Sequence, residues 1–214
     1  MKKALITYGG WDGHDPQGVA ELFAEILKAE NFQVRLSDSL ECLLEDLTEY
    51  DLLIPIWTMS ELPEGAAHNV CEAVAKGTGI AGCHGGMCDA FRKSTEWQFM
   101  TGAQWVAHPG GEIDYEVNIN KASSSPLVEG IEDFSVTSEQ YYIHIDPAVN
   151  VLATTTFTHE GPHTANGKIA VPVAFTKRWG KGKVYYNSLG HNRYVFNIPE
   201  AREMMRRGFL YAAR

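Results

Sequence analysis

Apolar positions in the first 83 residues alternate between short continuous runs and stripes with helical spacing. The continuous runs predict strands and cover residues 3–9, 32–37, 51–57 and 79–83. The stripes predict helices that begin at Asp15 and Pro16, at about Ser39 and near residue 64. Pro16 suits the first helical position, and the Asp15 side chain is expected to cap the free amides. Strands that alternate with helices predict right-handed crossovers and a parallel sheet.

The pattern changes between His108 and about Thr158, where short alternating segments lie between Pro, Ser and Gly breaks. This region is predicted to form an antiparallel excursion from the sheet. Residues 169–190 then predict a β-hairpin that turns at residues 180–182, and a last helix buries a stripe from Ala201 to Ala212. No break in composition marks a second domain, so residues 1–214 are predicted to form a single α/β domain.

Composition excludes several classes of protein. The 27 acidic and 18 basic residues give a formal charge of −9 with no basic stripe, so nucleic acid is not an expected partner. No apolar run approaches the roughly 18 residues that span a bilayer, and the N-terminus turns polar too early for a signal peptide. A cytoplasmic protein without a membrane partner is expected. The 4 cysteines form no C-x-x-C pair and are expected to be reduced thiols.

Ligands of open parallel sheets bind beyond the carboxyl ends of the strands. The predicted strands deliver an unusual set of histidine and tryptophan residues to that edge: Trp11, His14, Trp57, His84 and His191, with Asn192 following. Imidazole suits proton transfer or metal binding, and an indole face suits a sugar ring. A polar organic ligand is therefore predicted at this edge, although each such residue taken alone is more often structural.

The most specific motif is the run from Gly82 to Gly86, which has the G-x-Nu-x-G spacing of a nucleophile elbow. In such a strand-to-helix turn, a strained central residue projects its side chain over the sheet edge, and the flanking glycines avoid steric clashes. The central residue here is His84. Cys83 stands one place too early, which turns its side chain to the other face and argues against a cysteine nucleophile.

Together with this turn, residues 6–15 (ITYGGWDGHD), 107–111 (AHPGG) and 171–191 resemble the trehalose-utilisation (ThuA-like) family over nearly the whole chain. The resemblance implies a flavodoxin-like, three-layer α/β/α sandwich similar to the class I glutamine amidotransferases. His84 would stand where the glutaminases carry cysteine, and His191 is similar in place to their catalytic histidine. An acidic residue followed closely by tyrosine matches Glu139 with Tyr141 or Tyr142. The family implies a carbohydrate or oxidised-sugar substrate.

These observations predict an enzyme that moves a proton on a sugar or keto-sugar. The expected acid and base residues are His84 and His191, followed by Glu139 and His108. The expected substrate-binding residues are Trp11, His14, Trp57, Gly85, Tyr141 and Asn192. No cofactor is required by this interpretation, and a homodimer is the base-rate expectation for the assembly.

Three alternatives stay open. In the first, His14, His84, His108 and His191 converge on a divalent metal such as Zn²⁺, although their linear spacing gives no support. In the second, the protein is a non-catalytic carbohydrate-binding or regulatory module that uses the same pocket. In the third, it is a hydrolase or amidotransferase that uses Cys83. His68 is expected to be solvated, whereas His144, His159 and His163 fall in an irregular region, where residues 158–168 form a loop over the pocket or a plain surface loop.

Overall fold

A nine-stranded sheet organises the chain in a computed structural model that describes residues 1–158 and 160–214. Its first five strands in spatial order are all parallel and form what we call the parallel half. They are β2 (Phe32–Ser37), β1 (Lys2–Gly10), β3 (Leu52–Thr58), β4 (Gly79–Cys83) and β11 (Gly182–Asn187). The alternation of strands and helices in the sequence therefore produces the parallel sheet that it predicts.

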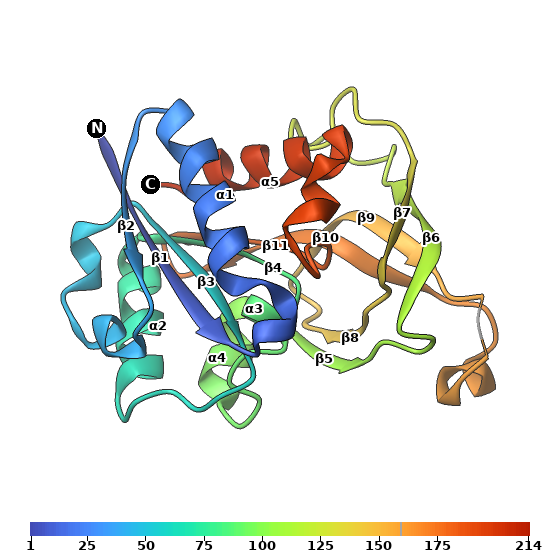
Figure 1. Ribbon diagram of the computed structural model, residues 1–214, viewed down its shortest axis with the longest axis horizontal. Coiled ribbons are helices and arrows are strands. Elements are labelled where there is room, and N and C mark those ends of the chain that lie inside the picture. Colours follow the sequence, from blue (N-terminus) through green and yellow to red (C-terminus); the bar gives the residue numbers. More distant parts are fainter. Residues whose placement is uncertain (159) are drawn as a thin grey trace.

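The antiparallel half continues the same sheet beyond β11 (Figure 1). Its strands, in spatial order, are β10 (Ala170–Trp179), β9 (Asn150–Thr156), β6 (Glu112–Ile119) and β7 (Phe134–Glu139). Strands β10 and β11 form the predicted hairpin. A separate two-stranded sheet joins β5 (Ala103–Ala107) to β8 (Tyr142–Ile145). The antiparallel excursion predicted from the sequence is thus an extension of the main sheet together with a small second sheet.

Helices cover both faces of the parallel half. Ala4 and Ile6 of β1 pack in one core cluster with α1 (Pro16–Ala29) and α5 (Pro199–Ala212), whereas Leu5 packs in a second cluster with α2 (Ala66–Lys76). Figure 1 shows α1 and α5 together on one side of the sheet. The short helices α3 (Gly85–Cys88) and α4 (Thr95–Thr101) follow β4. This burial on two faces explains why β3 reads as a continuous apolar run.

The prediction of an α-helix that begins at about Ser39 is wrong. The segment forms two 3₁₀ turns, Leu40–Leu44 and Leu47–Glu49. The side-chain amide of Asn69 donates to the carbonyls of Leu43 and Glu45, at 2.7 and 2.8 Å, which takes acceptors that a continuous helix would use. The Asp46 carboxylate then caps the second turn by accepting from Thr48. These side-chain hydrogen bonds therefore favour two short 3₁₀ turns over the α-helix that the spacing of apolar residues predicts.

The predicted cap of α1 is also wrong. Asp15 precedes the helix, but its backbone is left-handed (φ 48°) and its side chain makes no capping hydrogen bond. Instead its carboxylate accepts from Arg193, with Nε–Oδ2 and Nη2–Oδ1 distances of 2.6 and 3.1 Å. An ion pair between the two ends of the chain thus replaces the local cap. In the part of the chain that the structure describes, every helix is too short or too polar to cross a bilayer.

Candidate metal and substrate site

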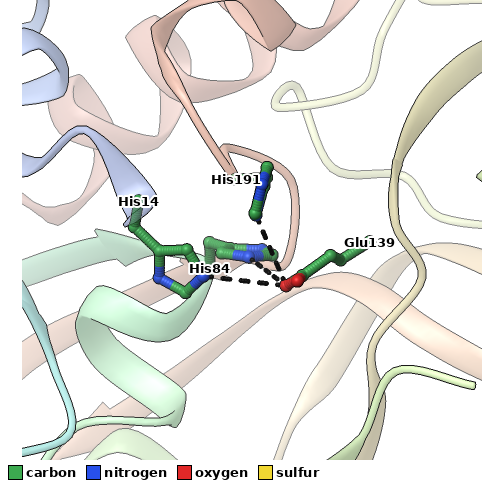
Figure 2. A group of neighbouring side chains, drawn as sticks. All are labelled: His14, His84, Glu139 and His191. Carbon is green, nitrogen blue, oxygen red and sulfur yellow. Dashed lines mark hydrogen bonds and ion pairs between the residues drawn. The ribbon is translucent and has the colours of Figure 1, made fainter. Parts of the chain in front are cut away.

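Three histidines meet at the carboxyl edge of the parallel half because each follows a different parallel strand. His14 ends a 3₁₀ turn after β1, His84 directly follows β4, and His191 lies four residues beyond β11. The fourth member of the group, Glu139, is the last residue of β7 in the antiparallel half. Figure 2 shows the three imidazole rings directed at the Glu139 carboxylate. The rule that ligands bind at the carboxyl ends of strands therefore predicts the position of the histidines.

The nitrogens that face Glu139 lie at distances typical of ligands sharing one metal ion. The distances to Glu139 Oε2 are 3.1 Å from His84 Nε2, 3.4 Å from His191 Nδ1 and 3.6 Å from His14 Nε2. In a tetrahedral site with metal–ligand bonds of about 2.0–2.1 Å, neighbouring ligand atoms are about 3.3 Å apart. The four ligand atoms all lie within 4.8 Å of one another. The donor set fits a divalent cation of the Zn²⁺ type.

The opposite nitrogen of each ring is held by a second partner. His84 Nδ1 lies 2.7 Å from the carbonyl oxygen of Ser188, His14 Nδ1 lies 2.8 Å from Thr58 Oγ1, and His191 Nε2 lies 2.8 Å from Glu112 Oε1. A carbonyl can only accept, so His84 must carry its proton on Nδ1, which leaves a lone pair on Nε2. Metal-binding histidines have this arrangement, in which an outer partner fixes the tautomer and the ring orientation.

The electrostatics of the group favour a cation at its centre. Burial lowers the pKa of His84 to about 4, so this ring is neutral at pH 7 and its Nε2 lone pair faces Glu139. Burial alone would raise the pKa of the Glu139 carboxyl, but its contacts, above all with His14 and His191, hold this pKa well below the usual range. A lone pair and a carboxylate that face each other in a dry interior repel unless a proton or a cation lies between them.

Two further nitrogens that face Glu139 also favour a cation at the centre of the group. Within the described residues, His14 Nε2 and His191 Nδ1 are buried without a hydrogen-bond partner. The contact with Glu139 raises the pKa of His191, so a proton and a divalent cation compete for its Nδ1. The group that the structure brings together differs in one member from the metal set predicted from the sequence: it contains Glu139, and His108 lies at its edge.

The turn that carries His84 has the strained geometry predicted for an elbow. His84 has φ 47° and ψ −139°, an unusual conformation for a residue with a side chain. A Cβ on Gly85 would lie 2.7 Å from Thr58 Oγ1 and 2.9 Å from His14 Cε1. Gly85 therefore lets the His14–Thr58 pair pack against the turn, which is how it contributes to the site.

Although His84 stands at the centre of the turn, as predicted, it is buried, and only 1% of the residue is exposed. Tyr141 stacks on the imidazole with ring centroids 3.9 Å apart, and Glu139 approaches its Nε2. Both residues come from the chain between β7 and β8, which the pattern of the parallel strands does not place. The antiparallel half thus closes over the elbow.

Cys83 is not a nucleophile in this structure. Its side chain belongs to the core cluster on the α1 and α5 face and is 2% exposed. Burial raises the pKa of its thiol to about 12, so the reactive thiolate is absent at neutral pH. The burial and the raised pKa argue against the alternative of a cysteine-dependent hydrolase or amidotransferase. All four cysteines are buried free thiols, as expected.

Several side chains form a solvent-facing rim around the buried group. His108, whose side chain is 38% exposed, places Nε2 3.7 Å from Glu139 Oε1. Trp11 is 48% exposed and meets His14 edge-on, with ring centroids 4.7 Å apart. Trp105 lies 5.6 Å from His108 and 6.3 Å from Tyr141 between ring centroids. Two tryptophans and one histidine are therefore the partly exposed neighbours of the buried group.

Other predicted residues have structural contacts instead. The Trp57 ring packs on Gly9, and its Nε1 donates to Ser60. The Asn192 side chain caps a 3₁₀ turn by accepting from the Tyr194 amide. Their assignment to substrate binding stays a prediction. His68 is exposed, as expected, and pairs with Glu96.

The predicted loop over the pocket is partly folded. Residues Pro162–Asn166 form a 3₁₀ turn, and His163 is buried against Phe157 and Tyr142. His144 is exposed on β8, and His159 lies outside the described residues.

Sequence reasoning missed Glu112, Ser188 and Trp105. Glu112 pairs directly with Glu139 in the β6–β7 register, although 27 positions separate them in the chain. The carbonyl of Ser188 leaves no signal in the residue type. Trp105 lies in the AQWVA strand close to the AHPGG motif, which was the signal that could have drawn attention to it.

The fold and the site define an α/β protein whose sheet edge holds a cluster of three histidines and one glutamate. The sequence profile of the ThuA family, described as trehalose utilisation, matches residues 3–212, and the chain belongs to this family. No curated protein matches the chain.

Solved structures with similar folds share little sequence with this chain. A ThuA-like protein from Parabacteroides merdae has a TM-score of 0.76 and 19% identity, over 99% of this chain and 89% of that one. A ThuA-like protein from Bacteroides uniformis has a TM-score of 0.74 and 16% identity, over 99% and 91% of the two chains. A β-galactosidase from Bacillus circulans sp. alkalophilus has a TM-score of 0.62 and 18% identity, over 99% of this chain and 30% of its own. At these identities the likeness shows the fold alone.

Proposed function

We propose that the protein is a metal-dependent enzyme that moves a proton on a sugar or keto-sugar. One observation carries the proposal: three buried imidazole nitrogens face Glu139 Oε2 at 3.1–3.6 Å, while the opposite nitrogen of each ring already has a partner. Two of these nitrogens, His14 Nε2 and His191 Nδ1, have no hydrogen-bond partner among the described residues, whereas in a purely hydrogen-bonded core cluster buried nitrogens would find protein partners.

His14, His84, His191 and Glu139 would hold the cation. When bound there, a divalent cation supplies Lewis-acid polarisation of a carbonyl oxygen, which acidifies the neighbouring carbon. His108 is the half-exposed base at the rim, because its Nε2 lies beside the outer oxygen of Glu139. Trp11 and Trp105 offer apolar faces on which a sugar ring can stack. The chain's own residues thus provide binding, orientation and a proton acceptor.

The comparisons support the carbohydrate part of the proposal by analogy. The family's description names trehalose utilisation, and the fold recurs within a longer chain named as a β-galactosidase. The helices on both faces of the parallel half support a flavodoxin-like, three-layer arrangement for that half. The reaction itself rests on the geometry of the site, because a fold alone supports many activities.

A second candidate, a non-catalytic carbohydrate-binding or regulatory module, is favoured by the burial of the group. His14, His84, Glu139 and His191 are each at most 8% exposed, and closed four-ligand sites are typical of structural metals. Such a module would bind the cation and a sugar without turnover. The two candidates share the metal and differ in the chemistry at the rim.

The first test measures metal by mass spectrometry on protein purified without a histidine tag. We expect about one equivalent of a divalent metal in the wild type and in His68→Ala, and less than about a tenth in His84→Ala. His68 is an exposed histidine, so its variant controls for the loss of an imidazole. Wild-type protein that binds no divalent metal when titrated would contradict the proposal.

The second test incubates the metal-loaded protein with disaccharides and their keto derivatives in deuterated water and follows the label by NMR. Deuterium at a carbon next to the carbonyl, lost in His108→Ala, supports the enzyme. Saturable sugar binding without any label supports the regulatory module.

A further inference from the structure

A second charged group lies at the rim, on the loop that follows α3. The Asp89 carboxylate is buried, with only 4% of its side chain exposed, and it accepts two hydrogen bonds from Arg92. The distances are 2.5 Å for Nε–Oδ1 and 3.0 Å for Nη2–Oδ2. The Arg92 side chain is itself 44% exposed. The buried Asp89 carboxylate thus binds one edge of the half-exposed Arg92 guanidinium.

The guanidinium is also fixed from its flat face. Its central carbon lies 4.6 Å from the centroid of the Trp105 ring, a cation–π distance. Two contacts therefore define the plane and the rotation of the Arg92 side chain. An exposed guanidinium is already solvated by water, so it does not need contacts with Asp89 and Trp105 to remain charged at the surface.

The backbone beneath Arg92 is anchored to the parallel half. The amide of Met59 donates to the Asp89 carbonyl at 2.9 Å, and the amide of Phe91 donates to the Met59 carbonyl at 3.0 Å. Phe91 is buried with φ 50°, a conformation that side chains tolerate only where their surroundings impose it. The side-chain amide of Gln98 donates to the Arg92 carbonyl at 2.8 Å. The position of Arg92 is therefore set before any ligand arrives.

The remaining donors of Arg92 match a second anion. Arginine carries five N–H donors, and Asp89 uses the edge formed by Nε and Nη2. The end formed by Nη1 and Nη2 keeps three N–H groups, and within the described residues no hydrogen bond to Nη1 is present. That end has the spacing of a carboxylate or of two phosphate oxygens.

Arg92 is linked to the buried group through the rim aromatics. Trp105, on which Arg92 packs, lies next to His108 and Tyr141, and Tyr141 stacks on His84. An elongated ligand lying along Trp105 would therefore meet the guanidinium at one end and the His108 side of the buried group at the other.

We propose that Arg92 binds an anionic group of the substrate, so that the substrate is a sugar acid or a sugar phosphate instead of a neutral sugar. This inference rests on the proposed function for the place of the ligand. It adds the charge class of the substrate and a specificity-determining residue. Asp89 and Trp105 act on the ligand only through Arg92 and are positioning residues.

The test compares binding of glucuronate, glucose 6-phosphate and glucose by isothermal titration calorimetry in wild type, Arg92→Gln and Arg35→Gln. Arg35 is the matched control, because it pairs with Glu45 through both terminal nitrogens and is also 44% exposed, but lies on the edge strand β2. We expect at least one anionic sugar to bind about tenfold more tightly than glucose to the wild type. Arg92→Gln should remove that preference, and Arg35→Gln should keep it.

Comparing the two anionic sugars shows whether Arg92 prefers a carboxylate or a phosphate. Preference for glucuronate assigns a carboxylate, and preference for glucose 6-phosphate assigns a phosphate. Arg92→Lys, which keeps the charge but loses the fork, should retain only part of the preference. If the unpaired Asp89 prevents Arg92→Gln from folding, the double variant Asp89→Asn/Arg92→Gln removes both charges and is used in its place.

Equal affinity for charged and neutral sugars in the wild type would overturn the inference, as would an unchanged preference in Arg92→Gln. Metal content, measured in the same samples, keeps the two proposals apart. An anion preference in protein that binds no metal contradicts only the proposed function. Full metal content without an anion preference contradicts only the role of Arg92.

Discussion

The two halves of the sheet contribute to the site in different ways. The parallel half supplies three histidines, each from a turn directly after a strand, because parallel strands end at a common edge. The antiparallel half supplies the single carboxylate, Glu139, and also Glu112, the outer partner of His191. One half therefore provides imidazole nitrogens, and the other provides the negative charge that makes the group suitable for a cation.

The difference also concerns access. The histidines from the parallel half are buried, whereas His108 and Trp105, which lie around β5, border the solvent. Metal binding should therefore depend on both halves together, and substrate selection should depend mainly on the chain around β5 and on the loop that holds Arg92.

The largest expected effect comes from removing the one carboxylate. Glu139→Gln keeps the shape of the side chain but replaces the anion by an amide, a much weaker ligand. We expect less than about a tenth of an equivalent of metal after dialysis, measured by mass spectrometry. Glu116→Gln, the same change on the exposed side of β6, should retain the metal. Full occupancy in Glu139→Gln would show that the histidines alone suffice.

A pair of matched core variants compares the stability of the two halves. Phe209 of α5 is fully buried against Phe23, with ring centroids 4.9 Å apart, whereas Phe134 begins the edge strand β7 and is 9% exposed. Phe209→Ala should lower the free energy of unfolding by about 3–5 kcal/mol and Phe134→Ala by about 2 kcal/mol, because an edge site can relax. Urea denaturation measures both values, and equal losses would contradict the comparison.

Glu112→Gln should weaken the metal site without emptying it. The Glu112 carboxylate contacts His191 through the outer nitrogen of the ring, at 2.8 Å. Outer partners of metal-bound histidines typically contribute about 10–100-fold to affinity. Competition with a chromophoric chelator measures this loss. An affinity unchanged from that of Glu116→Gln would mean that the His191 ring is positioned without Glu112.

The smallest expected effect concerns the contact between α5 and the antiparallel half. Glu203 binds Arg206 and Arg207, and Arg207 in turn donates to the carbonyls of Pro126 and Glu129. Hydrogen bonds from Arg206 above all lower the pKa of Glu203 from 4.5 to about 2. Glu203→Gln should cost about 0.5–1 kcal/mol at pH 7, since solvent screens the pair.

The pH dependence of this cost has a defined sign. A carboxyl with a lowered pKa in the folded state stabilises the protein above its unfolded value of 4.5, and this contribution is lost as the pH falls toward 2. The difference between wild type and Glu203→Gln in urea denaturation should therefore shrink at pH 3. Exposed Glu64 provides the control variant Glu64→Gln. A difference that grows on acidification would contradict the assigned ion pair.

The sequence predicts the parallel half well and the assembly of the site only in part. Apolar runs and stripes predict β1, β3, β4, α1 and α2, because burial on one or two faces imposes a period that can be read in a single chain. The same strands place His14, His84 and His191 at one edge. The apolar pattern does not predict the 3₁₀ turns after Ser39, because these turns depend on hydrogen bonds from the side-chain amide of Asn69, which lies on a distant helix.

Glu139 illustrates the limit more clearly. The resemblance to a family places it among the candidates, but nothing in its local sequence pairs it with the histidines. Its position follows from the register of β6 with β7 and of β9 with β10, both of which join segments that are far apart in the chain. For the same reason the metal set predicted from histidine content alone includes His108 and omits Glu139.

The order of the strands has a consequence for biosynthesis. β11 is the last strand to be made, yet it lies between β4 and β10 in the middle of the sheet. Until residues Gly182–Asn187 have been made, β4, which leads to His84, and β10 are not joined in one sheet. The proposed cation site is therefore complete only after this last strand has been made, and truncated translation products that end before β11 should bind no cation there.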